Sequence, residues 1–183
     1  MNIVYHKTAA APPRKTPFQY LFKPASIAVI GASNDTFKPG GRVFTSLKGH
    51  GYAGALWPVN PKADQIAGLP VFKTIAQLPA APDLAIVAIP ATQVVPALNE
   101  LAARGTGAVV VLTSGFGEKD EAGRRLEQQM LQIAREAGMT LIGPNCSGFL
   151  TKAYKGKFAG LVPDLPGGAV DFISGSGATV DFV

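Results

Sequence analysis

The sequence predicts an α/β fold in which a doubly wound parallel sheet is covered by helices on both faces. Five short apolar segments alternate along the chain with segments of helical periodicity. Each apolar segment is nearly continuous, which is typical of parallel strands buried on both faces. A glycine or proline lies within three residues of the end of each one. The five predicted strands are residues 26–30, 55–59, 84–89, 108–112 and 139–142.

Helices are predicted between these strands wherever apolar residues recur at helical spacing. Thr92 is expected to cap the second helix, and glycines end all three. After Pro61 we expect a short helix and then a small extended piece at 69–72. Pro58 places the second strand at an edge or an irregular position, because proline cannot donate a ladder hydrogen bond. The main helices are predicted over residues 41–50, 92–104 and 118–137.

The same pattern divides the chain into three parts. Residues 1–20 are expected to be an extended N-terminal segment, because Pro17 and two earlier prolines stop a helix. Residues 21–150 form the doubly wound domain. Residues 151–183 are expected to hold a linker and the truncated start of a second α/β domain, because a predicted strand at 169–173 is followed by a glycine-rich turn.

Composition indicates a folded cytoplasmic protein. The chain has 183 residues, of which 47% are hydrophobic, but its apolar runs are shorter than the ~18 residues of a membrane helix. No signal peptide pattern is present, and the single cysteine, Cys146, excludes an internal disulfide. The net charge of +5 is weak evidence for an anionic ligand. We expect no nucleic-acid partner, no membrane partner and no metal site, because the corresponding motifs are missing.

Ligands of doubly wound sheets bind beyond the carboxyl ends of the strands. All five predicted ends carry Gly, Pro or small polar residues, which let the backbone approach a ligand closely. A purely structural protein also needs turns here, so the argument depends on all five loops together. These loops are residues 31–41, 60–62, 90–92, 113–118 and 143–148.

The loop after the first strand is a candidate phosphate site. Gly31 and the two adjacent glycines later in the loop allow backbone amides to point at a phosphate. The helix that follows adds the positive end of its dipole. Ser33, Lys38 and Arg42 add a hydroxyl and two cationic groups. The spacing departs from the dinucleotide fingerprint, because the second glycine is missing and the loop before the glycine pair is too long.

The end of the second strand distinguishes between nucleotides. An NAD site usually places an acidic residue there to hold the ribose hydroxyls. This chain has Asn60 and Lys62 instead. A lysine suits a phosphate on the ribose, either the 3′-phosphate of coenzyme A or the 2′-phosphate of NADP.

The fourth and fifth loops contain the remaining candidates. Ser114, Phe116 and Glu118 form a second candidate ligand loop, although Glu118 also suits the first turn of a helix. Asn145 is able to bind a polar ligand group or to satisfy its own turn. Cys146 is expected to be a small buried residue rather than a nucleophile, because no histidine lies near it in the sequence.

Five blocks, in order, resemble the coenzyme A-binding domain of NDP-forming acyl-CoA synthetases. These are the ADP-forming acetyl-CoA synthetases, related to the alpha subunit of succinyl-CoA synthetase. The resemblance covers about residues 20–183 and implies a Rossmann-like sheet followed by a flavodoxin-like second domain. The matching blocks are SIAVIGAS (26–33), PVNPK (58–62), DLAIVAIPA (83–91), SGFGE (114–118) and GPNCSG (143–148).

The resemblance implies a position for each part of coenzyme A. The loop around Ser33 and the turn from Pro58 to Lys62 would hold the nucleotide end. Ile89 and Pro90 would lie against the adenine or the pantetheine. The remaining implied contacts are Ser114, Phe116 and Glu118 along the pantetheine, Asn145 near the thiol, and the turn at Ser176 and Gly177 facing the phosphate of a phosphohistidine.

The implied reaction joins an acid to coenzyme A with cleavage of ATP to ADP and phosphate, through an acyl phosphate and a phosphohistidine. Neither His6 nor His50 matches the phosphorylated histidine, and the ATP-grasp part is absent. We therefore expect no catalytic residue here. Coenzyme A or acyl-CoA is the expected ligand, and ATP or ADP with Mg²⁺ belongs to the complete enzyme. The remaining synthetase domains or subunit are the expected partners, and an oligomer is compatible with the sequence.

Two other functions remain open at the level of the sequence. The same domain forms the pseudo-synthetase half of some bacterial protein lysine acetyltransferases, where it is thought to sense acyl-CoA. An NADP-binding oxidoreductase domain is the third alternative, which the imperfect fingerprint disfavours. The domains beyond residue 183 would distinguish a synthetase from an acetyltransferase.

Overall fold

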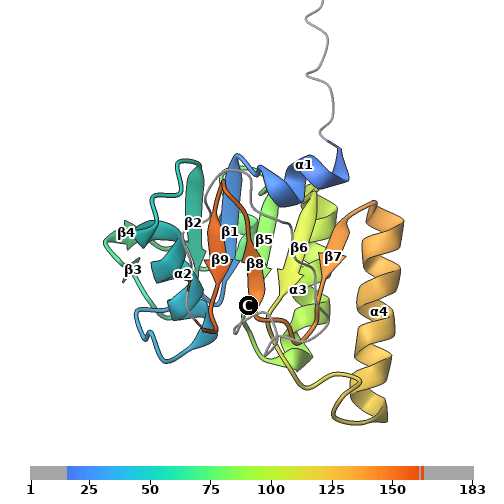
Figure 1. Cartoon of the computed structure of the whole chain (residues 1–183). Coiled ribbons are helices and arrows are strands. Elements are labelled where there is room, and N and C mark those ends of the chain that lie inside the picture. Colours follow the sequence, from blue (N-terminus) through green and yellow to red (C-terminus); the bar gives the residue numbers. More distant parts are fainter. Residues whose placement is uncertain (1–15, 161, 163–183) are drawn as a thin grey trace, which may run out of the picture.

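The computed structural model describes residues 16–160 and 162, and it confirms the predicted parallel sheet (Figure 1). Five strands pair in the order β2-β1-β5-β6-β7, and every pair is parallel. The strand β2, which contains Pro58, lies at an edge as expected. The strands are β1 (Ser26–Ile30), β2 (Ala55–Val59), β5 (Leu84–Val87), β6 (Ala108–Val111) and β7 (Thr140–Ile142).

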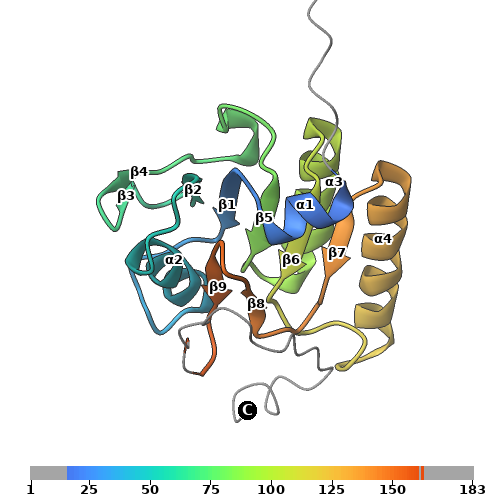
Figure 2. The same ribbon diagram turned by 45° about the horizontal axis from the view of Figure 1, so that its top comes forward.

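Alternate residues of the central strands enter two separate cores, as the period of two in a strand requires. Ala28 and Ile30 of β1 pack with α3 and α4 on one face, whereas Ile27 and Val29 pack with α1 and α2 on the other. Both faces are therefore covered (Figures 1 and 2). The helices are α1 (Pro17–Phe22), α2 (Pro39–Gly49), α3 (Ala91–Arg104) and α4 (Glu121–Ala137).

The residues at the helix ends explain where most of the helices begin and end. Gly105 and Gly138 adopt left-handed conformations at the carboxyl ends of α3 and α4, as predicted. Helix α4 begins three residues later than expected, because the Asp120 side chain caps it by accepting a hydrogen bond from the amide of Gly123 at 2.7 Å. The expected cap by Thr92 is wrong, since α3 begins at Ala91 without a side-chain cap.

One predicted element is replaced by another structure. The expected helix after Pro61 is instead a hairpin of β3 (Gln65–Ile66) and β4 (Leu69–Pro70), because Ala67 and Gly68 take positive φ angles and reverse the chain. A 3-10 turn, η1 (Ile75–Gln77), follows it. The expected extended piece is confirmed, since Phe72 bridges to Val59 of β2.

The prediction that residues 1–20 are extended is wrong for the last residues of that segment. Pro17 begins α1 rather than preventing it, because the first position of a helix has no intrahelical partner for an amide hydrogen. Thr16 and Gln19 complete a capping box around it. Residues 1–15 lie outside the described residues.

The expected linker also begins with regular structure. Strands β8 (Gly148–Leu150) and β9 (Lys155–Lys157) form an antiparallel hairpin that packs on the core containing α2. Lys157 is only 4% exposed, so this part of the expected linker is packed against the domain. Tyr154 explains the docking, because its buried hydroxyl donates to the carbonyl of Leu21 at 2.8 Å. The predicted strand at 169–173 lies outside the described residues.

The start of α2 packs so closely on the end of β1 that a side chain would not fit. A Cβ at Gly40 would collide with the carbonyl oxygen of Gly31, whereas a Cβ at Gly49 in the same helix would meet nothing within 4 Å. We predict that Gly40→Ala lowers the free energy of unfolding by about 1–3 kcal/mol through overpacking. Gly49→Ala should be neutral or slightly stabilising. Urea denaturation of both variants tests this, and equal stabilities would contradict the packing described.

Candidate functional site

The carboxyl ends of the five strands bring the five predicted loops together along one edge of the sheet. Because the strands are parallel neighbours, the loops follow the strand order, with the β2 loop first and the β7 loop last. Four inter-strand spacings of about 4.8 Å make this edge roughly 19 Å long. An elongated ligand lying along the edge would therefore meet the loops in the order β2, β1, β5, β6 and β7.

The β1 loop is held by its own hydrogen bonds. Gly31 has a φ of 89°, and its amide donates to the carbonyl of Val59 at 2.9 Å. Ser33 Oγ accepts a hydrogen bond from the amide of Asp35 at 3.0 Å, and Asp35 Oδ1 accepts one from the amide of Phe37 at 2.9 Å. The loop therefore holds a defined shape, and the hydroxyl hydrogen of Ser33 remains available for a ligand.

Asn60 joins the β1 and β2 loops. Its Nδ2 donates to the carbonyl of Ala32 at 2.8 Å, and its Oδ1 accepts from the amides of Lys62 and Ala63 at 2.8 and 3.2 Å. Since both polar ends of this side chain are engaged, Asn60 positions the two loops. Pro58 is buried near the end of β2, just before this turn.

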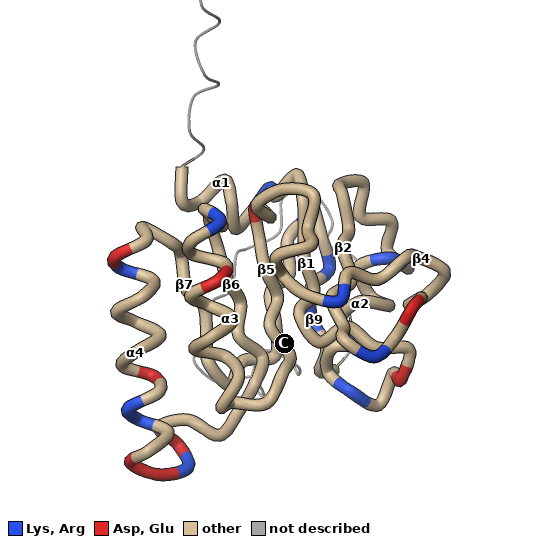
Figure 3. The backbone as a smooth tube through the Cα atoms, turned by 180° about the vertical axis from the view of Figure 1, so that it is seen from behind, with Lys and Arg blue, Asp and Glu red and all other residues tan. Residues whose placement is uncertain are grey.

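Three exposed cationic side chains lie on the β2–β1 side of the edge. Lys38 precedes α2 and forms an ion pair with Asp35 at 3.6 Å, and Arg42 lies in the first turn of α2. The Lys62 ammonium has no hydrogen bond or ion pair to any residue that the structure describes. Figure 3 shows Lys and Arg positions around α2 and β1–β4, with acidic positions among them. A free exposed ammonium at Lys62 is able to pair with a ligand anion.

The β6 loop is organised by the carboxylate of Glu118. Its carboxylate accepts hydrogen bonds from the amides of Gly115 and Phe116 at 2.5 and 3.1 Å. The bond from Gly115 is the main cause that holds the pKa of Glu118 below its ordinary value of 4.5. Phe116 is fully buried, so it lies beneath the surface of the edge, whereas Ser114 is exposed.

The β5 and β7 loops are attached to the β6 loop. Thr113 Oγ1 donates to the carbonyl of Ile89 at 2.7 Å, and the amide of Asn145 donates to the carbonyl of Thr113 at 2.9 Å. Asn145 has a φ of 54° and is exposed. Ile89 is half-buried and Pro90 is exposed at the start of α3. Both residues and Asn145 therefore lie at the surface of this edge.

Cys146 and His50 do not form a catalytic pair. The Cys146 thiol is half-buried, donates to the carbonyl of Val111 at 3.3 Å, and has a pKa raised by burial, which agrees with a structural role. His50 Nδ1 lies 2.8 Å from the carbonyl oxygen of Ser46 in its own helix. The predicted turn at Ser176 and Gly177 lies outside the described residues.

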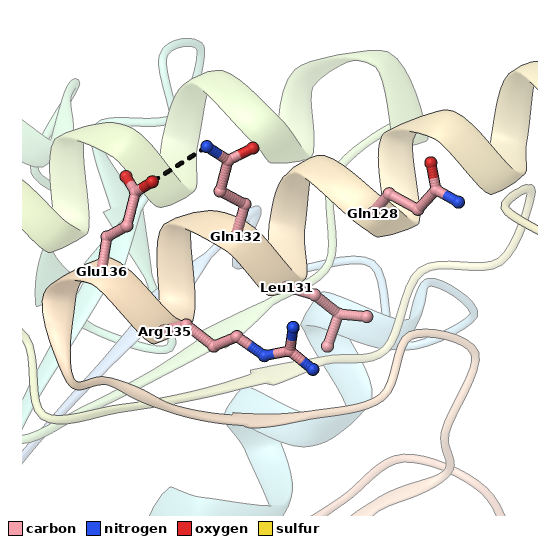
Figure 4. Close-up of a pocket in the computed structure, with 5 residues that line it drawn as sticks. All are labelled: Gln128, Leu131, Gln132, Arg135 and Glu136. Atoms are coloured by element: carbon pink, nitrogen blue, oxygen red, sulfur yellow. Dashed lines mark hydrogen bonds between the residues drawn. The ribbon is translucent and has the colours of Figure 1, made fainter.

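Two hollows of the described surface lie away from the five loops. A hollow of about 460 Å³ lies on the second half of α4, where Gln132 donates to Glu136 at 2.9 Å along the helix (Figure 4). A second hollow of about 360 Å³ adjoins it and reaches Pro17. Both lie toward the amino ends of the strands, opposite to the five loops. The candidate site is thus distinct from these two hollows.

Two observations on the described residues concern other partners. The described residues contain no cluster of three or more His, Cys, Asp or Glu side chains placed to hold a metal ion. None of their helices combines the length and apolar character needed to cross a bilayer.

Several positioning residues were not singled out from the sequence. Thr113 joins three loops, and Asn34 joins the β1 loop to the β3–β4 hairpin through the carbonyl of Gln65 and the amide of Ala67 at 2.8 and 2.9 Å. The sequence did contain a signal for such positioning residues, because Asp, Asn and Ser side chains in turns commonly accept hydrogen bonds from amides two residues further along the chain. Asp35 does so here with Phe37.

A doubly wound sheet with glycine-containing loops and exposed cationic side chains along its carboxyl edge defines a nucleotide-binding α/β domain. Comparison with known families makes this specific. The chain belongs to the family described as "CoA binding domain", which matches residues 25–152.

Individual relatives support the same assignment. The alpha subunit of an ADP-forming acetate–CoA ligase II of Pyrococcus furiosus is 40% identical over 159 residues, covering 87% of this chain and 34% of the relative. A trans-feruloyl-CoA synthase from an unknown prokaryote is 41% identical over 128 residues, covering 70% and 18% respectively. An acetyl-coenzyme A synthetase 1 of Candidatus Korarchaeum cryptofilum, solved with phosphate and ADP, has 33% identity and a TM-score of 0.75, with coverage of 82% and 32%.

The chain therefore spans about a third or less of the length of these relatives. It is the coenzyme A-binding portion homologous to ADP-forming acyl-CoA synthetases, as the resemblance indicated. The matches lend no support to the acetyltransferase and oxidoreductase alternatives.

The Glu118 contacts predict a pH dependence confined to the β6 loop. Because the folded-state pKa is lowered, the carboxylate contacts are present above pH 4.5 and are lost as the pH falls through the lowered pKa. Amide chemical shifts of Gly115 and Phe116 should titrate together with a midpoint below 4.5, and Glu118→Gln should remove that titration. A midpoint at or above 4.5 would show that the carboxylate is not held by these amides.

Proposed function

We propose that the five loops hold coenzyme A lengthwise along the carboxyl edge, as the coenzyme A-binding part of an ADP-forming acyl-CoA synthetase. The nucleotide end lies over the β2 and β1 loops and the thiol end lies at the β7 loop. The single observation that carries the proposal is the order of the loops. The sheet order β2-β1-β5-β6-β7 is also the order in which the implied contacts follow coenzyme A from phosphate to thiol.

The nucleotide end meets the cationic side of the edge. Lys62 is exposed and has no partner among the described residues, so it is available to the 3′-phosphate. Lys38 and Arg42 are exposed nearby and add favourable charge for the pyrophosphate. Gly31 and Ser33 contribute close backbone and a hydroxyl donor.

The pantetheine arm then crosses the β5 and β6 loops toward β7. Ile89 and Pro90 supply an apolar surface, and Ser114 supplies an exposed hydroxyl. Glu118 holds the shape of the loop, and the buried Phe116 anchors the loop in the core. Asn145 lies at the far end, where its exposed side chain approaches the thiol.

In the proposed reaction, an acid, coenzyme A and ATP give an acyl-CoA, ADP and phosphate. This chain binds and orients coenzyme A, while the remaining synthetase domains or subunit supply the phosphohistidine and bind ATP or ADP with Mg²⁺. The two relatives named for acetate and for trans-feruloyl-CoA differ in their acid but are both about 40% identical to this chain. This similarity supports the proposal that the shared portion binds coenzyme A rather than the acid.

Two further expectations belong to the same proposal. A turn at Ser176 and Gly177 would face the phosphate of the phosphohistidine. The complete protein would act in the cytoplasm, where Cys146 stays reduced, and would assemble with its other domains or subunits.

Calorimetry with coenzyme A, dephospho-coenzyme A, NADP and NAD tests the proposal. Coenzyme A should bind best, and dephospho-coenzyme A should bind more weakly. Lys62→Ala should weaken coenzyme A by about fivefold, corresponding to ~1 kcal/mol for an exposed ion pair, and leave dephospho-coenzyme A unchanged. High salt should reduce the difference between the two ligands.

Lys23→Ala is the matched control, because Lys23 is an exposed lysine directly after α1, at the opposite edge of the sheet. It should bind both ligands like the wild type. Binding of NAD or NADP without binding of coenzyme A would contradict the proposed function. An equal effect of Lys62→Ala on both ligands would contradict the phosphate role alone.

A further inference from the structure

Phe37 is the most exposed large apolar side chain among the described residues. Its exposed fraction is 97%, compared with 73% for Phe18 and 43% for Phe22. Removing a phenylalanine ring from water lowers the free energy, and a fully exposed ring does not contribute this stabilisation to the fold. The ring therefore has its whole surface available for a contact that the free domain does not make.

The backbone beneath Phe37 is fixed rather than loose. The amide of Phe37 donates to Asp35 Oδ1 at 2.9 Å, and the amide of Lys38 donates to the carbonyl of Asp35 at 3.1 Å. Asn34 ties the same loop to the β3–β4 hairpin. The loop thus holds the backbone that carries the ring at a defined position, which lowers the entropy cost of a contact.

The position lies within the cationic side of the carboxyl edge. Phe37 is followed by Lys38, and α2 with Arg42 begins two residues later. Asn60 bonds the β1 loop to the turn that carries Lys62. An exposed aromatic ring in a loop beside exposed cations matches a ligand that joins phosphates to a flat heterocycle, because bases stack on aromatic side chains.

We propose that Phe37 stacks on the adenine ring of the bound nucleotide and so selects the base at the nucleotide end. The inference rests on the proposed function, because it requires coenzyme A to lie with its nucleotide over the β1 and β2 loops. Lys62 then pairs with the phosphate while Phe37 covers the base. The pantetheine arm has no flat aromatic group and makes no such contact.

The test compares coenzyme A, adenosine 3′,5′-bisphosphate and pantetheine by calorimetry on the full chain. Phe37→Ala should weaken coenzyme A and the bisphosphate by the same factor, about 5- to 100-fold for one stacked base. Pantetheine should bind wild type and variant equally. Phe37→Trp should restore binding, whereas Phe37→Leu should restore little, because it keeps apolar area without an aromatic face.

Phe18→Ala is the matched control, since Phe18 is an exposed phenylalanine of α1 at the opposite edge of the sheet. It should leave all three affinities unchanged, and thermal unfolding should show that every variant is folded. Wild-type affinity of Phe37→Ala for the bisphosphate would overturn the stacking and leave the proposed function intact. Failure of the wild type to bind coenzyme A would overturn both.

Discussion

The close approach of backbone segments at the carboxyl edge is the constraint on which the rest of the structure depends. A Cβ at Gly31 would collide with the carbonyl of Ala88, one at Gly40 with the carbonyl of Gly31, and one at Gly143 with the carbonyl of Val111. The loops can lie directly on the strand ends only because these positions have no side chain. The same closeness brings α2 against β1 and leaves a continuous edge across five strands.

Side chains at this edge divide into those that hold the loops and those that remain available. Asn60, Thr113 and Glu118 use their polar atoms on neighbouring backbone groups. Lys62 and Phe37 extend into solvent from loops that these and similar bonds fix. A binding edge organised in this way meets its ligand with little rearrangement, which lowers the entropy cost of association.

The sheet was predictable because buried parallel strands are marked by continuous apolar runs and helix ends by glycines. The errors came from residues whose effect depends on position. Pro17 begins a helix instead of preventing one, and Ala67 turns a predicted helical segment into a hairpin through its positive φ. Among candidate site residues, the sequence could not separate Asn60 from Lys62, because only tertiary contacts show that one side chain is occupied and the other is free.

A crystal structure of this chain with coenzyme A would test the central claim most directly, namely that the ligand follows the order of the loops. The account predicts the 3′-phosphate within ion-pair distance of Lys62 and the thiol beside the loop that carries Asn145. A coenzyme A molecule lying in the reverse direction, or bound in the hollow on α4 beside Leu131, would contradict it.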